Sequence, residues 1–168
     1  MLYKHFYGYG MSVAMRYTRH REDAKDVFNE SFFKVFENLK TFDKTKSLKA
    51  WISRIVTNHA IDFYRSSVRQ SIVQHTEHLE NIDVASAESP ADTLHAEAIF
   101  ELVQNLPDAQ RLVFNLYEID GFTHEEVAEQ LGISVSGSRA TLHRAKQRLK
   151  LSFQNMIGEA KKNYESKF

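Results

Sequence analysis

Residues 122–150 read FTHEEVAEQLGISVSGSRATLHRAKQRLK and predict two helices joined by a tight turn. Thr123 and Glu126 have the spacing of a capping box, and Gly132 permits a left-handed turn after the first helix. Ser134 can cap the second helix just beyond that turn. The segment therefore predicts a helix-turn-helix, a motif in which the second helix enters the major groove of DNA.

The second of these helices is basic, although the whole chain has a formal net charge of zero. Residues 133–150 hold five Lys or Arg and no acid. A recognition helix needs such cations for phosphate contacts, and its N-terminal half reaches the bases. A merely solvated basic surface would explain an isolated charged run. The capped helix and the glycine turn before the run favour DNA binding instead.

Charge also divides the 168-residue chain into segments. Residues 1–70 carry 13 Lys and Arg against 7 Asp and Glu, residues 71–106 carry none against 7, and residues 107–168 carry 9 against 8. The stretch SIVQHTEHLENIDVASAESPAD, residues 71–92, mixes polar and acidic residues with few apolar ones, which is typical of a linker. A surface loop with a short helix is the alternative for this stretch.

Helical periodicity dominates the N-terminal segment. Residues 22–42 repeat apolar side chains every three or four positions, which predicts a helix with one buried side. Residues 47–67, SLKAWISRIVTNHAIDFYRSS, predict a second helix with Ser47 as its N-cap. The side chains expected to face inward are Ala24, Val27, Phe28, Phe32, Val35 and Leu39 in the first helix, and Leu48, Trp51, Ile52, Ile55 and Val56 in the second.

The C-terminal segment predicts further helices before the helix-turn-helix, separated by Pro107 and ended by Gly121. No run shows the alternation of a strand. We therefore expect an all-α protein of two small helical domains on a flexible acidic linker. The expected boundaries are residues 1–70 for the first domain, 71–92 for the linker and 93–168 for the second domain.

Composition argues against an enzyme. The chain has no cysteine, which excludes disulfides, Cys-ligated zinc and a Cys nucleophile, and it has no glycine-rich phosphate loop or nucleophile elbow. His75, His78 and His95 form a possible metal cluster, but no helix places two of them on one side with a carboxylate. We expect no catalytic residue, cofactor or metal. No secretory leader or membrane span is evident, so we expect a soluble, cytoplasmic protein without direct membrane insertion.

Two blocks of the sequence resemble a known family. EDAKDVFNESFFKVFENLKTFD (22–43) and SLKAWISRIVTNHAIDFYR (47–65) resemble region two of the extracytoplasmic-function sigma factors, and residues 106–149 are similar to their region four. The resemblance implies an RNA polymerase sigma factor that directs core polymerase to specific promoters and aids DNA melting. It implies contacts with the beta-prime clamp and the beta flap of core polymerase, and a possible anti-sigma factor.

The resemblance also implies roles for individual residues. Asp26, Asn29 and Glu30 match the polymerase-binding helix, with Asn29 in place of the usual Gln. Asn58 matches a position that captures a flipped base of the minus-ten element. The other residues expected to contact minus-ten DNA are Lys44, Lys46, Lys49, Arg54 and Arg65. The residues expected to contact the minus-thirty-five element are Ser134, Ser136, Arg139, Thr141, His143, Arg144, Lys146 and Arg148.

The sequence departs from the family in the recognition helix. Where the family commonly reads Gly-Thr-Val-Lys-Ser-Arg, residues 136–141 read SGSRAT. Arg139 keeps the cation, but Ser138 replaces an apolar residue and Thr141 replaces an arginine. The promoter sequence therefore cannot be transferred from the family. A two-domain helix-turn-helix regulator that does not bind core polymerase is the alternative function, and an inactive sigma-like decoy is another.

Overall fold

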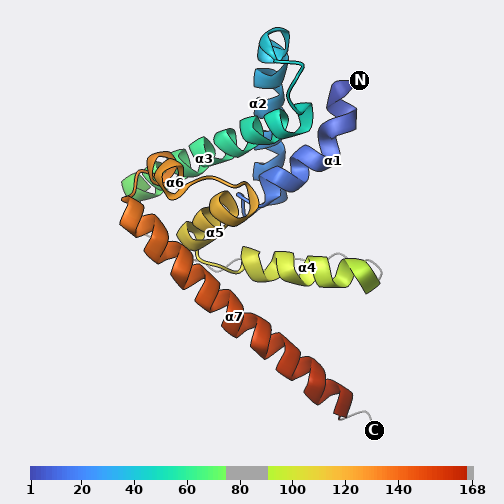
Figure 1. Ribbon diagram of the computed structural model, residues 1–168, viewed down its shortest axis with the longest axis vertical. Coiled ribbons are helices and arrows are strands. Elements are labelled where there is room, and N and C mark those ends of the chain that lie inside the picture. The colour runs from blue at the N-terminus through green and yellow to red at the C-terminus, as the bar shows by residue number, and fades with distance from the viewer. Residues whose placement is uncertain (75–90, 166–168) are drawn as a thin grey trace. The chain divides into compact units, whose positions relative to one another are not determined.

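Every regular element in the described part of the chain is a helix, which confirms the predicted all-α class (Figure 1). The structure is a computed structural model that describes residues 1–74 and 91–165, with side chains for residues 1–68 and 97–158. None of the helices within these ranges is long and apolar enough to span a membrane.

By their internal packing, the helices form two compact units, Met1–Glu80 and Asn81–Phe168. The predicted linker, residues 71–92, overlaps helices at both ends, since residues 71–74 end one helix and residues 91–92 begin the next. Its remaining residues, 75–90, lie outside the described part of the chain.

Three helices build the N-terminal unit, and each packs against the other two (Figure 1). They are α1 (Leu2–Met15), α2 (Arg21–Asn38) and α3 (Leu48–Gln74), with a 3-10 turn, η1 (Leu39–Thr41), after α2. Gly10 lets α1 approach α2 closely, because a Cβ atom at this position would clash with the ring of Phe28. The fully buried apolar side chains of this core include Val13, Val27, Phe28, Phe32, Val35, Ile52, Val56 and Ile61.

The predicted inward side of α2 is confirmed except at its end. Leu39 is 39% exposed, because α2 stops at Asn38 and Leu39 begins the 3-10 turn. In α3, Ile52 and Val56 are fully buried, whereas Leu48, Trp51 and Ile55 are half-buried. Ser47 caps α3 as predicted, since its Oγ accepts a hydrogen bond from the backbone N–H of Ala50 at 3.3 Å.

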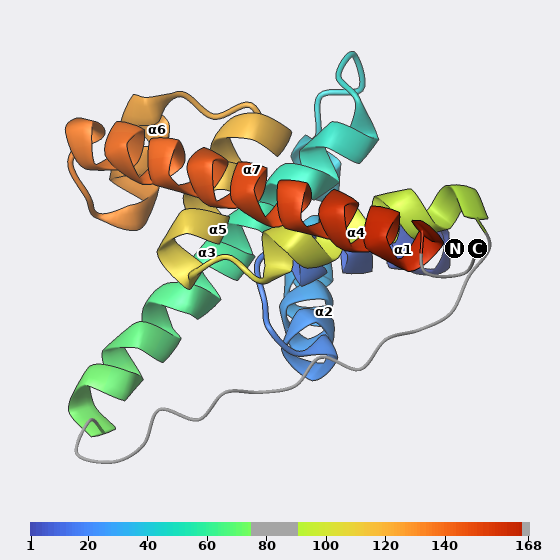
Figure 2. The same ribbon diagram turned by 90° about the horizontal axis from the view of Figure 1, so that it is seen from below.

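The C-terminal unit is built around its last and longest helix, α7 (Val135–Glu165), against which α5 and α6 pack (Figure 2). The helices before α7 are α4 (Ala91–Gln104), α5 (Asp108–Phe114), the π-helical turn η2 (Asn115–Ile119) and α6 (His124–Leu131). The buried guanidinium of Arg111 joins α4 to α5, because it lies 3.0 Å from the Asp108 carboxylate and donates to Gln104 Oε1 at 3.1 Å.

The helix-turn-helix forms as the sequence predicts. Thr123 and Glu126 make both hydrogen bonds of a capping box at the start of α6. Gly132 has a positive φ of 65° at the turn, a conformation that glycine adopts without strain. Ser134 Oγ then accepts from the backbone N–H of Gly137 at 2.9 Å and caps α7. These local bonds fix where the recognition helix begins.

Candidate polymerase and nucleic-acid interfaces

The predicted polymerase-binding residues lie on α2, but they differ in exposure. Asp26 and Glu30 are exposed, and they lie opposite the buried side of the helix. Asn29 is half-buried, and its Oδ1 accepts a hydrogen bond from the Tyr3 hydroxyl of α1 at 2.9 Å. Asn29 therefore helps to hold α1 against α2, and the carboxylates are the more accessible pair.

Glu30 is bonded to a residue that the sequence did not single out. His59 of α3 places Nε2 2.7 Å from Glu30 Oε2 and Nδ1 3.0 Å from the Nζ of Lys34. Glu30 and His59 are 29 positions apart in the chain, so only the packing of α2 on α3 reveals the contact.

An exposed aromatic side chain shares this surface of α2. Phe33 is 70% exposed and follows Asp26 and Glu30 at helical spacing, and Phe36 beside it is 51% exposed. Phe33 is not among the side chains expected to face inward, but the sequence pattern predicted no binding role for it. An exposed aromatic ring flanked by charged side chains is typical of a protein-binding surface. We call Asp26, Glu30 and Phe33 the docking stripe.

The loop before α3 carries Lys44 and Lys46, both exposed. Asp43 organises this loop, since its Oδ1 accepts from the Thr45 hydroxyl at 2.7 Å and from the Thr45 backbone N–H at 3.0 Å. These two bonds stabilise the carboxylate and hold the pKa of Asp43 below its usual value. The backbone N–H of Lys46 also donates to the Asp43 carbonyl at 3.0 Å, so the loop is a defined turn.

The remaining residues predicted to contact the minus-ten element line α3. Asn58 and Arg54 are exposed. Lys49 places its Nζ 4.4 Å from the centre of the Tyr9 ring, a cation–π contact that holds its side chain against α1. Arg65 Nη1 lies 3.8 Å from Asp62 Oδ1, three residues earlier in the same helix. Trp51, which we expected in the core, is half-buried and packs on Phe42 with ring centres 4.9 Å apart.

Several residues predicted to contact the minus-thirty-five element are already engaged within the protein. Ser134 acts as the cap of α7 and lies 3.1 Å from the Ser136 hydroxyl. Arg144 donates to the Thr141 hydroxyl at 3.2 Å. His143 and Arg148 are exposed.

Two cations of α7 pair with acids from other elements. Arg139 Nη2 lies 3.7 Å from Glu125 Oε1 of α6, with both side chains about two-thirds exposed. Lys146 Nζ lies 2.6 Å from Glu118 Oε1 of η2. Lys146 is therefore partly neutralised in the free protein. The acids were not foreseen, because each is brought to its partner by the fold of the C-terminal unit, in which α6 packs on α7 and η2 packs on α5 and α6.

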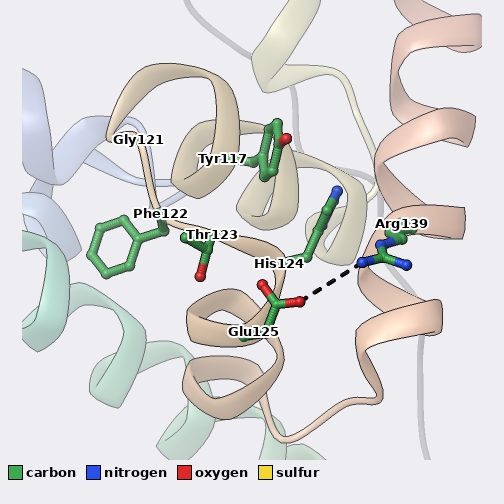
Figure 3. Close-up of a pocket in the computed structure, with 7 residues that line it drawn as sticks. All are labelled: Tyr117, Gly121, Phe122, Thr123, His124, Glu125 and Arg139. Carbon is green, nitrogen blue, oxygen red and sulfur yellow. Dashed lines mark ion pairs between the residues drawn. The ribbon is translucent and has the colours of Figure 1, made fainter.

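A shallow hollow beside Arg139 is lined by the rings of Tyr117 and His124 (Figure 3). His124 also contacts Ser138, the position where an apolar residue was expected. Ser138 is fully buried, and its hydroxyl lies 2.9 Å from His124 Nδ1. The His124 ring in turn stacks on Tyr117, with ring centres 4.2 Å apart. Burying the Ser138 hydroxyl without a hydrogen-bond partner would destabilise the fold. The contact with His124 offsets this cost and lets a serine occupy the position of an apolar residue.

No group of three potential metal ligands occurs among the described residues. His75 and His78, two members of the possible cluster considered above, lie outside those residues.

Comparison with known proteins agrees with this arrangement. The family model described as Sigma-70 region 2 matches residues 2–70, and the model described as Sigma-70, region 4 matches residues 96–149. RNA polymerase sigma factor YlaC of Bacillus subtilis is 29% identical over 153 residues, covering 89% of this chain and 88% of the relative. The ECF RNA polymerase sigma-E factor of Haemophilus influenzae is 27% identical over 161 residues, covering 89% of this chain and 85% of the relative.

A solved structure shares the fold. The chain is similar to the sigma factor RpoE of Bartonella quintana, which was solved in complex with the anti-sigma factor NepR. The TM-score is 0.57 at 20% identity, covering 86% of this chain and 89% of that one.

The region 2 match argues against the helix-turn-helix regulator considered above, because such a regulator would carry no such region. Region 2 and region 4 occur here in one chain, in the order found in relatives that align along most of their length. The chain therefore belongs to the sigma-70 family and is an RNA polymerase sigma factor of the extracytoplasmic-function type.

Proposed function

We propose that this sigma factor docks on the beta-prime clamp of core RNA polymerase through the docking stripe of α2. In this proposal α3 and the loop before it capture and hold the opened minus-ten DNA, and α7 reads the minus-thirty-five element while the C-terminal unit contacts the beta flap. The protein has no catalytic step of its own and acts in the cytoplasm, where core polymerase is found.

The docking stripe carries this proposal. Asp26, Glu30 and Phe33 are exposed on one side of α2, whose other side is fully buried. The stripe is therefore presented by a helix that cannot rotate without breaking the core. An aromatic anchor surrounded by carboxylates suits a partner surface with a pocket and basic residues.

The proposed minus-ten surface combines one base-reading residue with several cations. Asn58 has an amide that can both donate to and accept from the edge of a flipped base, which helps to offset a few kcal/mol of unstacking. Lys44 and Lys46 in the ordered loop and Arg54 on α3 can hold the backbone of the separated strand. The Asp43–Thr45 bonds support this role, because they fix the loop that carries the two lysines.

The proposed minus-thirty-five surface is the exposed side of α7. Ser138, Leu142 and Ala145 are buried, so the residues near Ser136 and His143 face outward. Arg139 near the start of the helix is suited to read a base, and Arg148 further along is suited to contact phosphates. The pairing of Lys146 with Glu118 favours a backbone role for Lys146 over a base contact.

A test of the whole proposal is reconstitution with core RNA polymerase. The purified chain should be retained with core polymerase in a pull-down, and sequencing of transcripts started in vitro should show initiation at defined promoters. Retention without any specific initiation would indicate a sigma-like decoy. If the protein is not retained, the docking proposal is wrong.

We also propose an anti-sigma factor as a regulatory partner, which the family resemblance implies. The RpoE chain of Bartonella quintana, which shares the fold, was solved with one. Affinity purification of the chain from its own cells, before and after stress, should recover a protein that blocks its retention by core polymerase. If no recovered protein competes with core polymerase, the chain is not regulated in this way.

A further inference from the structure

His59 links the two helices that carry the proposed docking and minus-ten surfaces. Its ring is 14% exposed between α3 and α2. Nε2 lies 2.7 Å from Glu30 Oε2, and Nδ1 lies 3.0 Å from Lys34 Nζ. Both partners belong to α2, one helical turn apart, so a single residue of α3 bonds an acid and a base of the neighbouring helix.

These two partners determine which ring nitrogen carries the proton. A lysine ammonium can only donate, so Nδ1 must accept from Lys34. Nε2 then carries the hydrogen and donates to the Glu30 carboxylate, a charge-assisted bond that is stronger than a neutral one. The neutral ring in this tautomer satisfies both contacts at once.

Without His59, Glu30 and Lys34 would be expected to pair with each other. They stand at the i, i+4 spacing with the acid first, the favourable order for an ion pair along a helix. Such a pair would turn the Glu30 carboxylate along α2 towards Lys34. His59 lies between them and bonds to each, which keeps the carboxylate in a defined position although the Glu30 side chain is 67% exposed.

We infer that His59 is a positioning residue of the polymerase interface. It holds Glu30 in the orientation in which the docking stripe meets core polymerase, and it diverts Lys34 from neutralising that carboxylate. A side chain ordered before binding loses less conformational freedom on binding, so the contact favours association without touching the partner. This inference rests on the proposed docking role of Glu30.

The test measures the affinity of the full chain for core polymerase in three variants. His59→Leu removes both hydrogen bonds, and we expect it to weaken binding about tenfold, as for coupled residues of one network. Glu30→Gln should weaken binding by a similar factor. The double variant should be no weaker than either single variant, because His59 acts only through Glu30.

Replacement of His59 by glutamine tests whether its hydrogen bonds to Glu30 and Lys34 are important, or only the space that its ring fills between α2 and α3. The amide of His59→Gln can donate to Glu30 and accept from Lys34, so binding should stay within about twofold of the unchanged protein. The matched control is Ser66→Leu, another polar residue of α3, whose hydroxyl bonds only within its own helix to the Phe63 carbonyl at 2.8 Å. The affinity of this control should not change.

The inference is overturned if His59→Leu binds as well as the unchanged protein, if its effect adds to that of Glu30→Gln, or if the glutamine variant is as weak as the leucine one. Reversing Asp26 and Glu30 to Lys in parallel tests the docking stripe itself. Loss of binding in that reversal together with normal binding of His59→Leu refutes only the role of His59. Normal binding in the reversal refutes the docking stripe.

Discussion

Arg139 Nη2 of α7 lies 3.7 Å from Glu125 Oε1 of α6, so an ion pair joins the two helices of the helix-turn-helix at the residue proposed to read a base (Figure 3). Both side chains are largely exposed, and such a pair contributes only about 0–1 kcal/mol. The pair is therefore weak enough to yield to DNA. Its consequence is to restrict where the guanidinium points before binding.

Changing Arg139 to Ala should remove the base contact proposed for its guanidinium. We expect a loss of roughly 1–3 kcal/mol and a relaxed preference at one position of the minus-thirty-five element. The matched control is Arg148→Ala, which should weaken binding to all promoters alike. It should also reduce, by about one, the slope of the logarithm of the binding constant against the logarithm of the salt concentration. Selection from a promoter library with holoenzyme at two salt concentrations measures both. The opposite pattern in the two variants would mean that α7 docks in the reverse direction.

Glu118→Gln should strengthen DNA binding by releasing Lys146. The 2.6 Å ion pair between them ties up a cation that would otherwise face phosphate. We expect about a two- to fivefold gain in holoenzyme affinity at low salt for all sequences alike. Adding Lys146→Ala should cancel that gain. Glu101→Gln, which removes an exposed acid of α4, controls for net charge, and an equal gain in this variant would show that Lys146 is not responsible.

Reversing both Asp26 and Glu30 to Lys should abolish holoenzyme formation while leaving the helical content unchanged. The two side chains are exposed, so the reversal changes the surface of α2 and not its core. Reversing Glu97 and Glu101 of α4 gives the same change of charge at the same spacing, and this control should still bind. Gel filtration with core polymerase and circular dichroism provide the measurements. Unchanged affinity of the first variant would rule out the assignment.

Phe33→Ala should weaken binding to core polymerase by about tenfold or more, the loss expected for an aromatic hot spot. Because Phe33 is 70% exposed, the free energy of unfolding should change by less than about 0.5 kcal/mol. Phe153→Ala removes another exposed phenylalanine, from α7, and is the matched control. Equal losses of binding in the two variants would indicate nonspecific hydrophobic contacts of exposed rings and not a specific role for Phe33.

The order of the loop before α3 should depend on the ionisation of Asp43. Its pKa is held below the usual value of an aspartate, first by the Thr45 hydroxyl and then by the Thr45 backbone N–H. A depressed carboxyl pKa contributes stability that is present above the unfolded value and lost as the pH falls through the folded value. The Thr45 amide resonance should therefore stay constant at neutral pH and shift only in acid, with a midpoint below that of an ordinary aspartate. A midpoint at or above the ordinary value would contradict the two bonds, and Asp43→Ala should abolish the transition.

Local chemistry explains which parts of the fold could be predicted. The capping box of Thr123 and Glu126, the left-handed Gly132 and the Ser134 cap are interactions between residues three or four positions apart, so the sequence displays them directly. The burial of Val27 and Phe28 follows from spacing in the same way. Leu39 fits that spacing but is exposed, because the repeat does not reveal that α2 ends one residue earlier.

The parts of the site that could not be predicted depend on helices meeting across the fold. Glu118 reaches Lys146, and His59 reaches Glu30, only after separate segments pack together. Phe33 was missed for a different reason, since its place outside the inward repeat does not say that a partner binds there. Many candidate residues could therefore be proposed from sequence, but their partners, orientation and accessibility required the structure.

Asn58 and His59 are consecutive residues of α3, and the second of them is bonded to α2. Successive residues of a helix differ by a rise of about 1.5 Å and a fixed rotation, so one peptide unit sets the offset between them. On the proposed roles, the residue that captures a flipped base is the direct neighbour of the residue that holds Glu30 of the docking stripe in position. The separation between the captured base and the polymerase contact would then be set by the packing of α3 on α2, and it would be the same at every promoter.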